Sequence, residues 1–431
     1  MHHFSPKDGA LHAEDISLEA LAETVGTPAY VYSTATLTRH YALLRQALDA
    51  HSEALGGPDG EGALIAFAVK ANSNLSVLST LARLGCGADT VSEGEIRRAL
   101  KAGIPAGRVI FSGVGKTDAE LAFAIQVGVR QINVESGAEL DRLIRVAASL
   151  SLHASPDVAI RVNPNIGAGG HARITTGGAT DKFGVPLAEA ADLYARAQAS
   201  GHLRPVGLAC HIGSQILDLQ PMRAAFRALA DTTRDLRSRG LTVRRLDLGG
   251  GLGVPYHGQT DTPSIADYAA MCAGELAGLG VEAAFEPGRL LTANAGLMLT
   301  RVIHVNTRAD GRRFLVLDAG MNDLMRPALY DAFHDLVPVR PRAGELAPYD
   351  LVGPICESTD VFARDRLLPP VQAGDLMAFM SAGAYGAVLS SEYNSRPLVP
   401  EVLVDGSASA VVRARPTYDE MWSREPLAPW L

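Results

Sequence analysis

Between residues 63 and 289, short apolar runs alternate with longer runs in which apolar residues recur every three or four positions. The short runs are of the kind that forms buried strands in a parallel sheet. We expect eight such strands, at Ala63–Lys70, Gly87–Ser92, Arg108–Gly113, Arg130–Ser136, Asp157–Pro164, Pro205–Gly213, Val243–Gly251 and Val281–Arg289.

The longer runs have the spacing of helices that pack one face against a core. Asp118 and Ser264 lie where helix N-caps are expected, and Gly128 and Gly240 lie where helices should end. The predicted helices are Leu75–Leu84, Glu93–Ala102, Thr117–Val127, Ala138–Leu150, Pro186–Ala199, Gln220–Arg239 and Ile265–Leu279.

Eight strands separated by helices predict a (β/α)₈ barrel, which needs roughly 250 residues. An open doubly wound sheet is the rival, but it usually has fewer strands and a glycine-rich turn after the first one. Here the first strand runs into Lys70-Ala71-Asn72-Ser73-Asn74, so the closed barrel is favoured. Its longest loop, Gly167–Gly184, is long enough to suggest a functional role.

After residue 290 the long helical runs disappear, and short strands are separated by glycine and proline, as in an antiparallel β domain. The strand-like segment Ala29–Tyr32 suggests that the N-terminal segment joins this second domain. We therefore expect a barrel domain at 36–290 and a β domain at 1–35 with 291–431. Strands of the β domain are predicted at Leu297–Asn306, Arg313–Asp318, Asp350–Gly353, Asp375–Phe379 and Leu398–Val404.

Charge and cysteine content narrow the class of protein. The chain has 39 Lys and Arg against 47 Asp and Glu, a net charge of −8, which argues against a nucleic-acid partner. No apolar run approaches the ~20 residues of a membrane-spanning helix, and the first residues lack the apolar core of a secretory signal. Four cysteines without a CxxC pair fit a reducing compartment and make a structural metal unlikely. We expect a cytoplasmic protein without a metal, a nucleic-acid partner or a membrane partner.

Four features at the carboxyl ends of the predicted strands, where barrel enzymes carry their working residues, suggest chemistry. Lys70 follows an apolar strand, and desolvation favours the neutral amine that forms an imine with an aldehyde. Gly249–Gly251 would bring backbone amides close to a phosphate. Glu286 could accept a hydrogen bond from a protonated ring nitrogen, and His211 could lie flat against an aromatic ring. Taken singly, each has an ordinary structural explanation: a solvated lysine, a tight turn, a Glu286–Arg289 ion pair or a core histidine.

Together these four features describe a site for pyridoxal 5′-phosphate (PLP), and the chain resembles the fold-type III PLP-dependent decarboxylases. The resemblance covers nearly the whole chain. It is carried by the motifs GTPAYVY (26–32), AVKAN (68–72), HIGSQ (211–215), EPGR (286–289), DAGMNDLMRPALY (318–330), GPICESTD (353–360) and GAYG (383–386).

The resemblance implies roles for individual residues, within these motifs and outside them. Lys70 binds the cofactor aldehyde covalently, His211 stacks on the ring, Glu286 pairs with the ring nitrogen, and Cys356 acts as general acid. Asp89 and Arg161 hold the cofactor and the histidine in place. Residues around the phosphate and its approach are Ser214, Gly250, Gly251, Gly288, Arg289 and Tyr385. Substrate-binding residues are Arg289, Arg326, Tyr330, Glu357 and Tyr385.

The implied reaction is decarboxylation of meso-2,6-diaminopimelate to L-lysine, the last step of lysine biosynthesis. A carboxylate rather than an arginine beside the ring nitrogen favours decarboxylation over racemisation. Two arginines and a glutamate suit a substrate whose far end carries both a carboxylate and an ammonium group. In this family Cys356 and Glu357 serve the partner's site, so the resemblance implies a homodimer with shared active sites.

Two other interpretations stay open at this point. A decarboxylase of another basic amino acid or of a carboxylated polyamine would share the cofactor site, but its substrate would leave the two arginines without a carboxylate partner. A non-catalytic PLP-binding homologue could dispense with Lys70 and Cys356, and both are present. For Arg326 alone, a surface salt bridge is the ordinary explanation.

Overall fold

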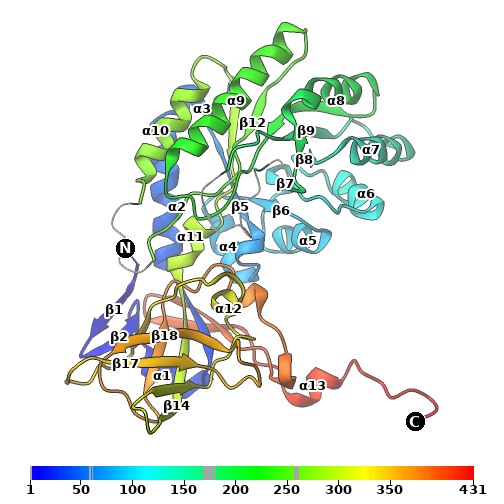
Figure 1. The fold of residues 1–431 in the computed structure, drawn as a ribbon. Coiled ribbons are helices and arrows are strands. Elements are labelled where there is room, and N and C mark those ends of the chain that lie inside the picture. The colour runs from blue at the N-terminus through cyan, green and yellow to red at the C-terminus, as the bar shows by residue number, and fades with distance from the viewer. Residues whose placement is uncertain (1, 58–59, 61, 168–177, 179–180, 257–261) are drawn as a thin grey trace. The chain divides into compact units, whose positions relative to one another are not determined.

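The computed structural model describes residues 2–57, 60, 62–167, 178, 181–256 and 262–431. These residues form two compact units. One unit contains residues 38–255 and 262–291, and the other contains residues 2–37, Tyr256 and 292–431. Both are drawn in Figure 1, in which the first unit holds most of the helices and the second most of the long strands.

Eight parallel strands of the first unit close into a barrel. Neighbours in the sheet pair in sequence order, and the last strand pairs with the first through Ala284 and Leu64. The prediction of a closed barrel is confirmed. Its strands are β5 (Leu64–Ala68), β6 (Gly87–Thr90), β7 (Val109–Phe111), β8 (Gln131–Val134), β9 (Asp157–Asn163), β11 (Arg204–Ala209), β12 (Arg245–Asp247) and β13 (Glu282–Phe285).

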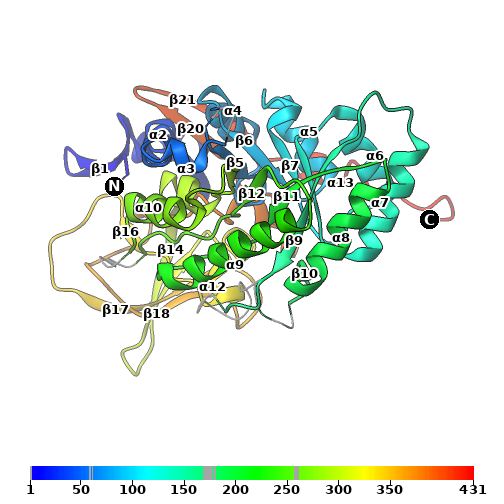
Figure 2. The same ribbon diagram turned by 90° about the horizontal axis from the view of Figure 1, so that it is seen from above.

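Helices alternate with these strands and lie outside them, as the view from above shows (Figure 2). Their apolar faces supply buried residues such as Leu78, Ile96 and Leu140 to the layer between helix and strand. All seven predicted helices are present, at α4 (Leu75–Arg83), α5 (Glu93–Lys101), α6 (Asp118–Val127), α7 (Gly137–Ser149), α8 (Leu187–Ala199), α9 (Leu219–Ser238) and α10 (Ile265–Leu276).

Helix ends depart from the prediction at one cap. Thr117, not Asp118, caps α6, because its hydroxyl accepts from the Glu120 amide while the Glu120 carboxylate reaches back to the Thr117 amide. Ser264 caps α10 as expected. Gly128 (φ +75°) follows α6 in the left-handed region, which glycine adopts at low cost.

Strands are shorter at their ends than the sequence suggests. Strand β5 stops at Ala68, and Lys70 lies in the following 3₁₀ turn, η1 (Val69–Ala71). A two-residue strand, β10 (Val185–Pro186), pairs with β9 and was not expected. Helix α2 (Thr34–Asp49), which leads towards the barrel, was likewise not predicted.

The second unit is built around one long strand, β14 (Gly296–Thr307). It pairs antiparallel with β4 (Ala29–Ser33), β15 (Arg313–Leu317) and β19 (Leu376–Phe379). The N-terminal segment therefore joins the C-terminal sheet, as expected. The other strands of the sheet are β16 (Leu336–Pro338), β17 (Ala347–Val352), β18 (Val361–Leu368), β20 (Glu401–Asp405) and β21 (Ala408–Arg413).

The sheet of the second unit is rich in antiparallel pairs without being wholly antiparallel. Two pairs, β15–β17 and β4–β20, run parallel. A separate small sheet contains β1 (Phe4–Lys7), β2 (Ala10–Ala13) and β3 (Ile16–Ser17), and it is followed by helix α1 (Leu18–Val25). Among the helices of the described chain, none is long and apolar enough to cross a membrane.

Candidate active site at the carboxyl ends of the barrel strands

Lys70 and Asp89 meet at the carboxyl end of the barrel. The Lys70 Nζ lies 3.3 Å from Oδ2 of Asp89, which is buried in β6. The lysine side chain itself is 39% exposed, so the amine can be reached from outside the strand layer. The second oxygen of Asp89, Oδ1, is buried and has no hydrogen-bond partner among the described residues. The structure thus holds a reachable amine beside a fixed carboxylate.

His211 follows β11 and is held as a neutral imidazole. Burial, and then the positive charges of Lys70 and Arg161, lower the pKa of His211 well below its usual range. The Gly250 amide donates to its Nδ1 at 3.1 Å, which places the ring proton on Nε2. A neutral ring held by its edge can present a flat face without adding a positive charge to the site.

The three glycines after β12 are required by close packing of neighbouring strand ends. Gly249 (φ +65°) and Gly251 (φ +111°) adopt the left-handed region. A Cβ on Gly250 would lie 2.1 Å from the Glu286 carbonyl oxygen, and one on Gly251 would lie 2.5 Å from the Gly213 carbonyl oxygen. Packing alone therefore accounts for this sequence, and the phosphate role of Gly250 and Gly251 stays a prediction.

Arg289 and Ser214 are joined by a hydrogen bond in the same unit. Arg289 is the first residue of α11 (Arg289–Thr292), directly after Gly288, and it is buried. Its Nη2 donates to the Ser214 hydroxyl at 3.1 Å. The hydrogen bond to Ser214 links the helix after β13 to the loop after β11.

Glu286 and Asp247 form a buried pair of carboxyl groups at the ends of β13 and β12. Burial raises the pKa of Glu286 well above its usual range, and the charges of Asp247 and Asp89 raise it further. The two side chains lie close enough that each shifts the pKa of the other, which favours one proton on the pair rather than two negative charges. One oxygen of Glu286, Oε1, is buried and lacks a hydrogen-bond partner among the described residues.

Arg161 is held by Glu135, which the sequence analysis did not single out. The Arg161 guanidinium donates to Glu135 Oε1 at 2.7 Å, and it lies 5.0 Å from the centre of the Phe183 ring. Glu135 also accepts from the backbone amides of Gly113 (2.9 Å) and Gly184 (3.0 Å). One carboxylate therefore fixes Arg161 and two loops. Most of the Gly167–Gly184 loop lies outside the described residues.

The barrel residues fit the group that the sequence resemblance implies. A reachable amine, a neutral imidazole and a buried carboxyl oxygen with an open acceptor position are the partners that the aldehyde, the ring face and the ring nitrogen of PLP require. The residues that would hold it are Lys70, Asp89, Arg161, His211, Ser214, Gly250, Gly251, Glu286, Gly288 and Arg289.

The second unit contains the other predicted site residues. Arg326 begins α12 (Arg326–Tyr330) and is buried, so the alternative of a surface salt bridge is wrong. Its Nη1 contacts His334 Nε2 at 2.8 Å and the Tyr256 hydroxyl at 3.4 Å. Because His334 uses Nδ1 to donate to the Met380 carbonyl, its Nε2 is left as an acceptor.

Tyr330 and Tyr385 are partly buried in this unit. Tyr330 ends α12. Tyr385 has φ +55°, a conformation that costs a non-glycine residue free energy and is concentrated at functional positions. The Gly383–Gly386 motif around it packs tightly, since a Cβ on Gly386 would lie 2.6 Å from the Ala382 carbonyl oxygen.

Cys356 and Glu357 are exposed on a loop between β17 and β18. The Cys356 amide donates to Asn394 Oδ1 at 3.2 Å. Hydrogen bonds from the hydroxyls of Tyr393 and Thr359 lower the pKa of Glu357, which keeps it a carboxylate at neutral pH. The exposure of Cys356 argues against its alternative interpretation as a small buried hydrophobe.

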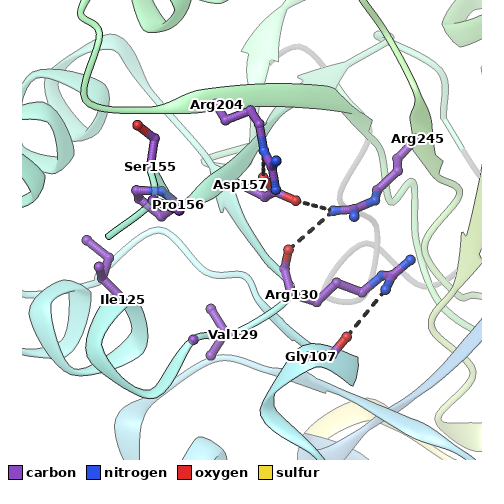
Figure 3. A pocket seen from close by; sticks show the side chains of 11 residues that line it. Gly107, Ile125, Val129, Arg130, Ser155, Pro156, Asp157, Arg204 and Arg245 are labelled. Carbon is purple, nitrogen blue, oxygen red and sulfur yellow. Dashed lines mark hydrogen bonds and ion pairs between the residues drawn. The ribbon is translucent and has the colours of Figure 1, made fainter. Parts of the chain in front are cut away.

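A cavity of about 340 Å³ lies at the opposite end of the barrel, where the strands begin (Figure 3). Its arginines are engaged with carboxylates or carbonyls: Arg245 bonds Asp157 at 2.8 Å, Arg204 bonds the same carboxylate, and Arg130 reaches the Gly107 carbonyl at 3.4 Å. A neighbouring cavity of about 550 Å³ shares this lining. These ion pairs join β9, β11 and β12, which fits a stabilising role at the amino-terminal face of a barrel.

Several residues of the site escaped the sequence analysis. Asp247 had a visible signal, because an acid between Leu246 and Leu248 in a buried strand needs a partner. Glu135 and Asn133 lie at the end of β8, where polar side chains point into the carboxyl end of the barrel. Nothing in the local sequence distinguishes His334, whose role depends on its contact with Arg326.

Comparisons with known proteins give consistent matches. The model of the family described as pyridoxal-dependent decarboxylase, pyridoxal binding domain, matches residues 42–293. The diaminopimelate decarboxylase of Pseudomonas aeruginosa is 47% identical over 429 residues, covering 100% of both chains, and that of Zymomonas mobilis is 46% identical over 429 residues, covering 99% of both. The crystal structure of diaminopimelate decarboxylase from Helicobacter pylori complexed with L-lysine has a TM-score of 0.88 at 40% identity, covering 94% of this chain and 98% of that chain.

Proposed function

Since the chain belongs to the family of pyridoxal-dependent decarboxylases, we propose that it uses PLP to decarboxylate meso-2,6-diaminopimelate, releasing CO₂ and L-lysine. The observation that carries this conclusion is the full-length similarity to diaminopimelate decarboxylases. This places the reaction at the last step of lysine biosynthesis. Decarboxylation of another basic amino acid is the weaker alternative, because these relatives match over the whole length of the chain.

Bound PLP supplies an electron sink for the pair of electrons left on Cα when CO₂ departs. The chain's own residues prepare that sink. Lys70 provides the amine that holds the aldehyde, and Asp89, 3.3 Å away, fixes its position. Glu286 presents Oε1 as an acceptor for the ring nitrogen, and His211 offers a neutral imidazole face. The roles of Asp89 and Glu286 suit buried carboxyl groups, and the role of His211 suits an uncharged ring.

Binding of the substrate's far end is proposed for residues of the second unit. Arg326, which is buried and planar, suits a carboxylate, while Glu357, whose pKa is lowered by two hydroxyl donors, suits an ammonium group. Tyr330 and Tyr385 contribute hydroxyl groups. Cys356 is exposed on its loop and delivers the proton that replaces CO₂. The β domain (1–35 and 291–431) thus supplies substrate-binding residues, and the barrel domain (36–290) binds the cofactor.

A homodimer with shared active sites completes the proposal. Its support is the exposure of Cys356 and Glu357 in the single chain, since catalytic groups that serve a partner's site must lie on the surface. A cytoplasmic location is supported by cysteines that form no disulfide in the described structure.

The direct test incubates the purified protein with PLP and meso-2,6-diaminopimelate and measures L-lysine and CO₂. L-lysine, L-ornithine and L-arginine are each tested separately as alternative substrates, with CO₂ release as the measurement. Borohydride reduction of the coloured protein should remove the visible absorbance and attach the cofactor to the peptide that contains Lys70. Lys70→Ala should abolish both colour and turnover, whereas Lys101→Ala, which changes an exposed lysine on α5, should leave both intact. A colourless wild-type protein, or turnover of L-ornithine in place of diaminopimelate, would contradict the proposal.

A further inference from the structure

Asp247 is a buried carboxyl group at the centre of the barrel that the proposed mechanism does not yet use. It is the last residue of β12 and is 1% exposed. A carboxyl group at such a depth persists only when neighbours satisfy it. Its neighbours therefore indicate what it does.

Burial raises the pKa of Asp247, and two neutral donors act against this by favouring its ionised form. Asn133 Nδ2 donates to its Oδ2 at 2.8 Å, and the Gly249 amide donates to its Oδ1 at 3.0 Å. The orientation of the Asn133 amide is fixed, because its Oδ1 accepts from Gln131 Nε2 at 2.8 Å and its Nδ2 also reaches the Ser112 hydroxyl at 3.0 Å. Both oxygens of Asp247 thus act as acceptors, which favours the charged state.

Glu286 must be the partner that brings the proton, because its pKa is raised well above its usual range. Glu286 lies beside Asp247 at the ends of the paired strands β13 and β12, and its Oε1 is buried and accepts no hydrogen bond from the described residues. A carboxyl group that shares a proton with a buried neighbour cannot rotate freely. The open oxygen is then held as a fixed acceptor.

We propose that Asp247 is a positioning residue for the cofactor ring: it takes the hydrogen bond of Glu286, so that Oε1 faces the ring nitrogen, and it supplies the negative charge that keeps that nitrogen protonated. The inference rests on the proposed PLP function. No bond forms or breaks in this arrangement, and one proton is shared by the two carboxyl groups. The other ionisable groups around the pair are Asp89 on β6, Lys70 on η1, Arg161 on β9, Cys210 after β11 and Tyr268 on α10.

The test uses Asp247→Asn and a matched double variant, Asn133→Asp/Asp247→Asn. The single variant removes the charge of residue 247. It also places the amide group of the substituted side chain opposite one of the two groups that donate to Asp247, the Asn133 amide or the Gly249 backbone amide. The double variant restores complementary donors and acceptors but moves the charge from residue 247 to residue 133, farther from Glu286. A merely structural role of Asp247 would be rescued by the swap, whereas a role that depends on the local charge would not.

Ring protonation is read from the ultraviolet absorbance of bound pyridoxine 5′-phosphate, which has the ring and phosphate of the cofactor but no aldehyde. We expect the pKa of the bound ring nitrogen to fall by at least about one unit in both variants, while the double variant regains thermal stability. In the decarboxylation assay, kcat should fall about tenfold or more with little change in KM. A ring pKa equal to the wild-type value in either folded variant would overturn the inference.

Infrared spectroscopy of the wild-type apoprotein gives a second measurement that needs no Asp247 variant. At pH 7 the shared proton should produce one protonated-carboxyl band that Glu286→Gln lacks. Absence of that band would contradict the inference even if both Asp247 variants failed to fold. Failure of the wild type to bind PLP or to release CO₂ would instead refute the proposed function, since the infrared band does not depend on cofactor or substrate.

Discussion

Arg326 shows how the environment of a single residue decides what its charge can do. Its guanidinium is buried against the neutral groups of His334 and Tyr256, whose rings meet edge to face at 5.8 Å. These neighbours contact Nη1 and help to fix the plane of the guanidinium. A positively charged group held in this manner is well prepared to bind a carboxylate through two parallel hydrogen bonds.

Arg326→Lys should therefore strongly impair binding of the substrate, although it keeps the positive charge at residue 326. The ammonium group cannot make the paired hydrogen bonds and loses its contact with His334. We expect KM for meso-2,6-diaminopimelate to rise about 100-fold, with a smaller change in kcat. Arg424→Lys, which alters an exposed arginine near the C-terminus, is the control and should match the wild type. Unchanged CO₂ release by Arg326→Ala would show that Arg326 does not bind the substrate.

At the scale of elements, the barrel places chemistry where strands end and helices begin. Helix α5 starts directly after β6, and its Glu95 reaches back to accept from the Val91 amide at 2.8 Å. This carboxyl group caps the turn beside the strand that carries Asp89. Burial is the main reason that the pKa of Glu95 is raised to about 7, and the charge of Asp89 adds to it.

Stability should depend on pH through Glu95. Because its pKa is higher in the folded than in the unfolded protein, its contribution favours folding at low pH and is lost as the pH rises from about 4.5 to about 7. Glu95→Gln keeps the hydrogen-bond acceptor and removes the titration. The difference in unfolding free energy between variant and wild type should grow, in favour of the variant, by about 1–3 kcal/mol between pH 4.5 and pH 8 in urea unfolding.

Glu93→Gln is the control for this experiment, since it removes a carboxylate from the same first turn of α5. Its effect should reflect the loss of its ion pair with Arg97 and of charge at the helix end. Equal pH dependence in wild type and Glu95→Gln would show that Glu95 does not hold its proton at neutral pH.

At the scale of the whole molecule, the order of segments in the chain matters. The N-terminal strand β4 pairs with β14 and β20, so the β domain is completed only after the barrel has been synthesised. Cys356 and Glu357 belong to this domain, and both are exposed to solvent in the single chain. A symmetric dimer in which each copy serves the other's site would give both residues a function.

Mixing two inactive variants tests the shared site. Lys70→Ala and Cys356→Ala should each be inactive alone, yet dissociation and random reassociation should restore about a quarter of wild-type activity, because half of the dimers then carry one intact site of two. Light scattering after size-exclusion chromatography gives the oligomeric state. A stable dimer that shows no recovery on mixing would mean that each site is made by one chain.

The sequence predicted the alternation of strands and helices well, because burial on both faces of a barrel strand and on one face of each helix leaves a regular apolar pattern. The sequence was less accurate at the ends of helices and strands, where individual hydrogen bonds and turns set the boundary. The cap of α6 moved by one residue to Thr117 because a reciprocal hydrogen bond with Glu120 was available. Strand β5 ended two residues early because Lys70 turns into η1.

What the sequence alone determined is the fold class and the strands of the barrel, and it indicated candidate reactive groups at the strand ends, since residue type and apolar periodicity are local properties of the chain. Only the tertiary structure decided their states of protonation and their supports. His211 is neutral because desolvation and two nearby cations lower its pKa, and Glu286 lies beside Asp247, 39 residues earlier in the sequence, because β12 and β13 pair. Such states depend on desolvation and on neighbours brought in from distant strands, and neither is written in a local stretch of sequence.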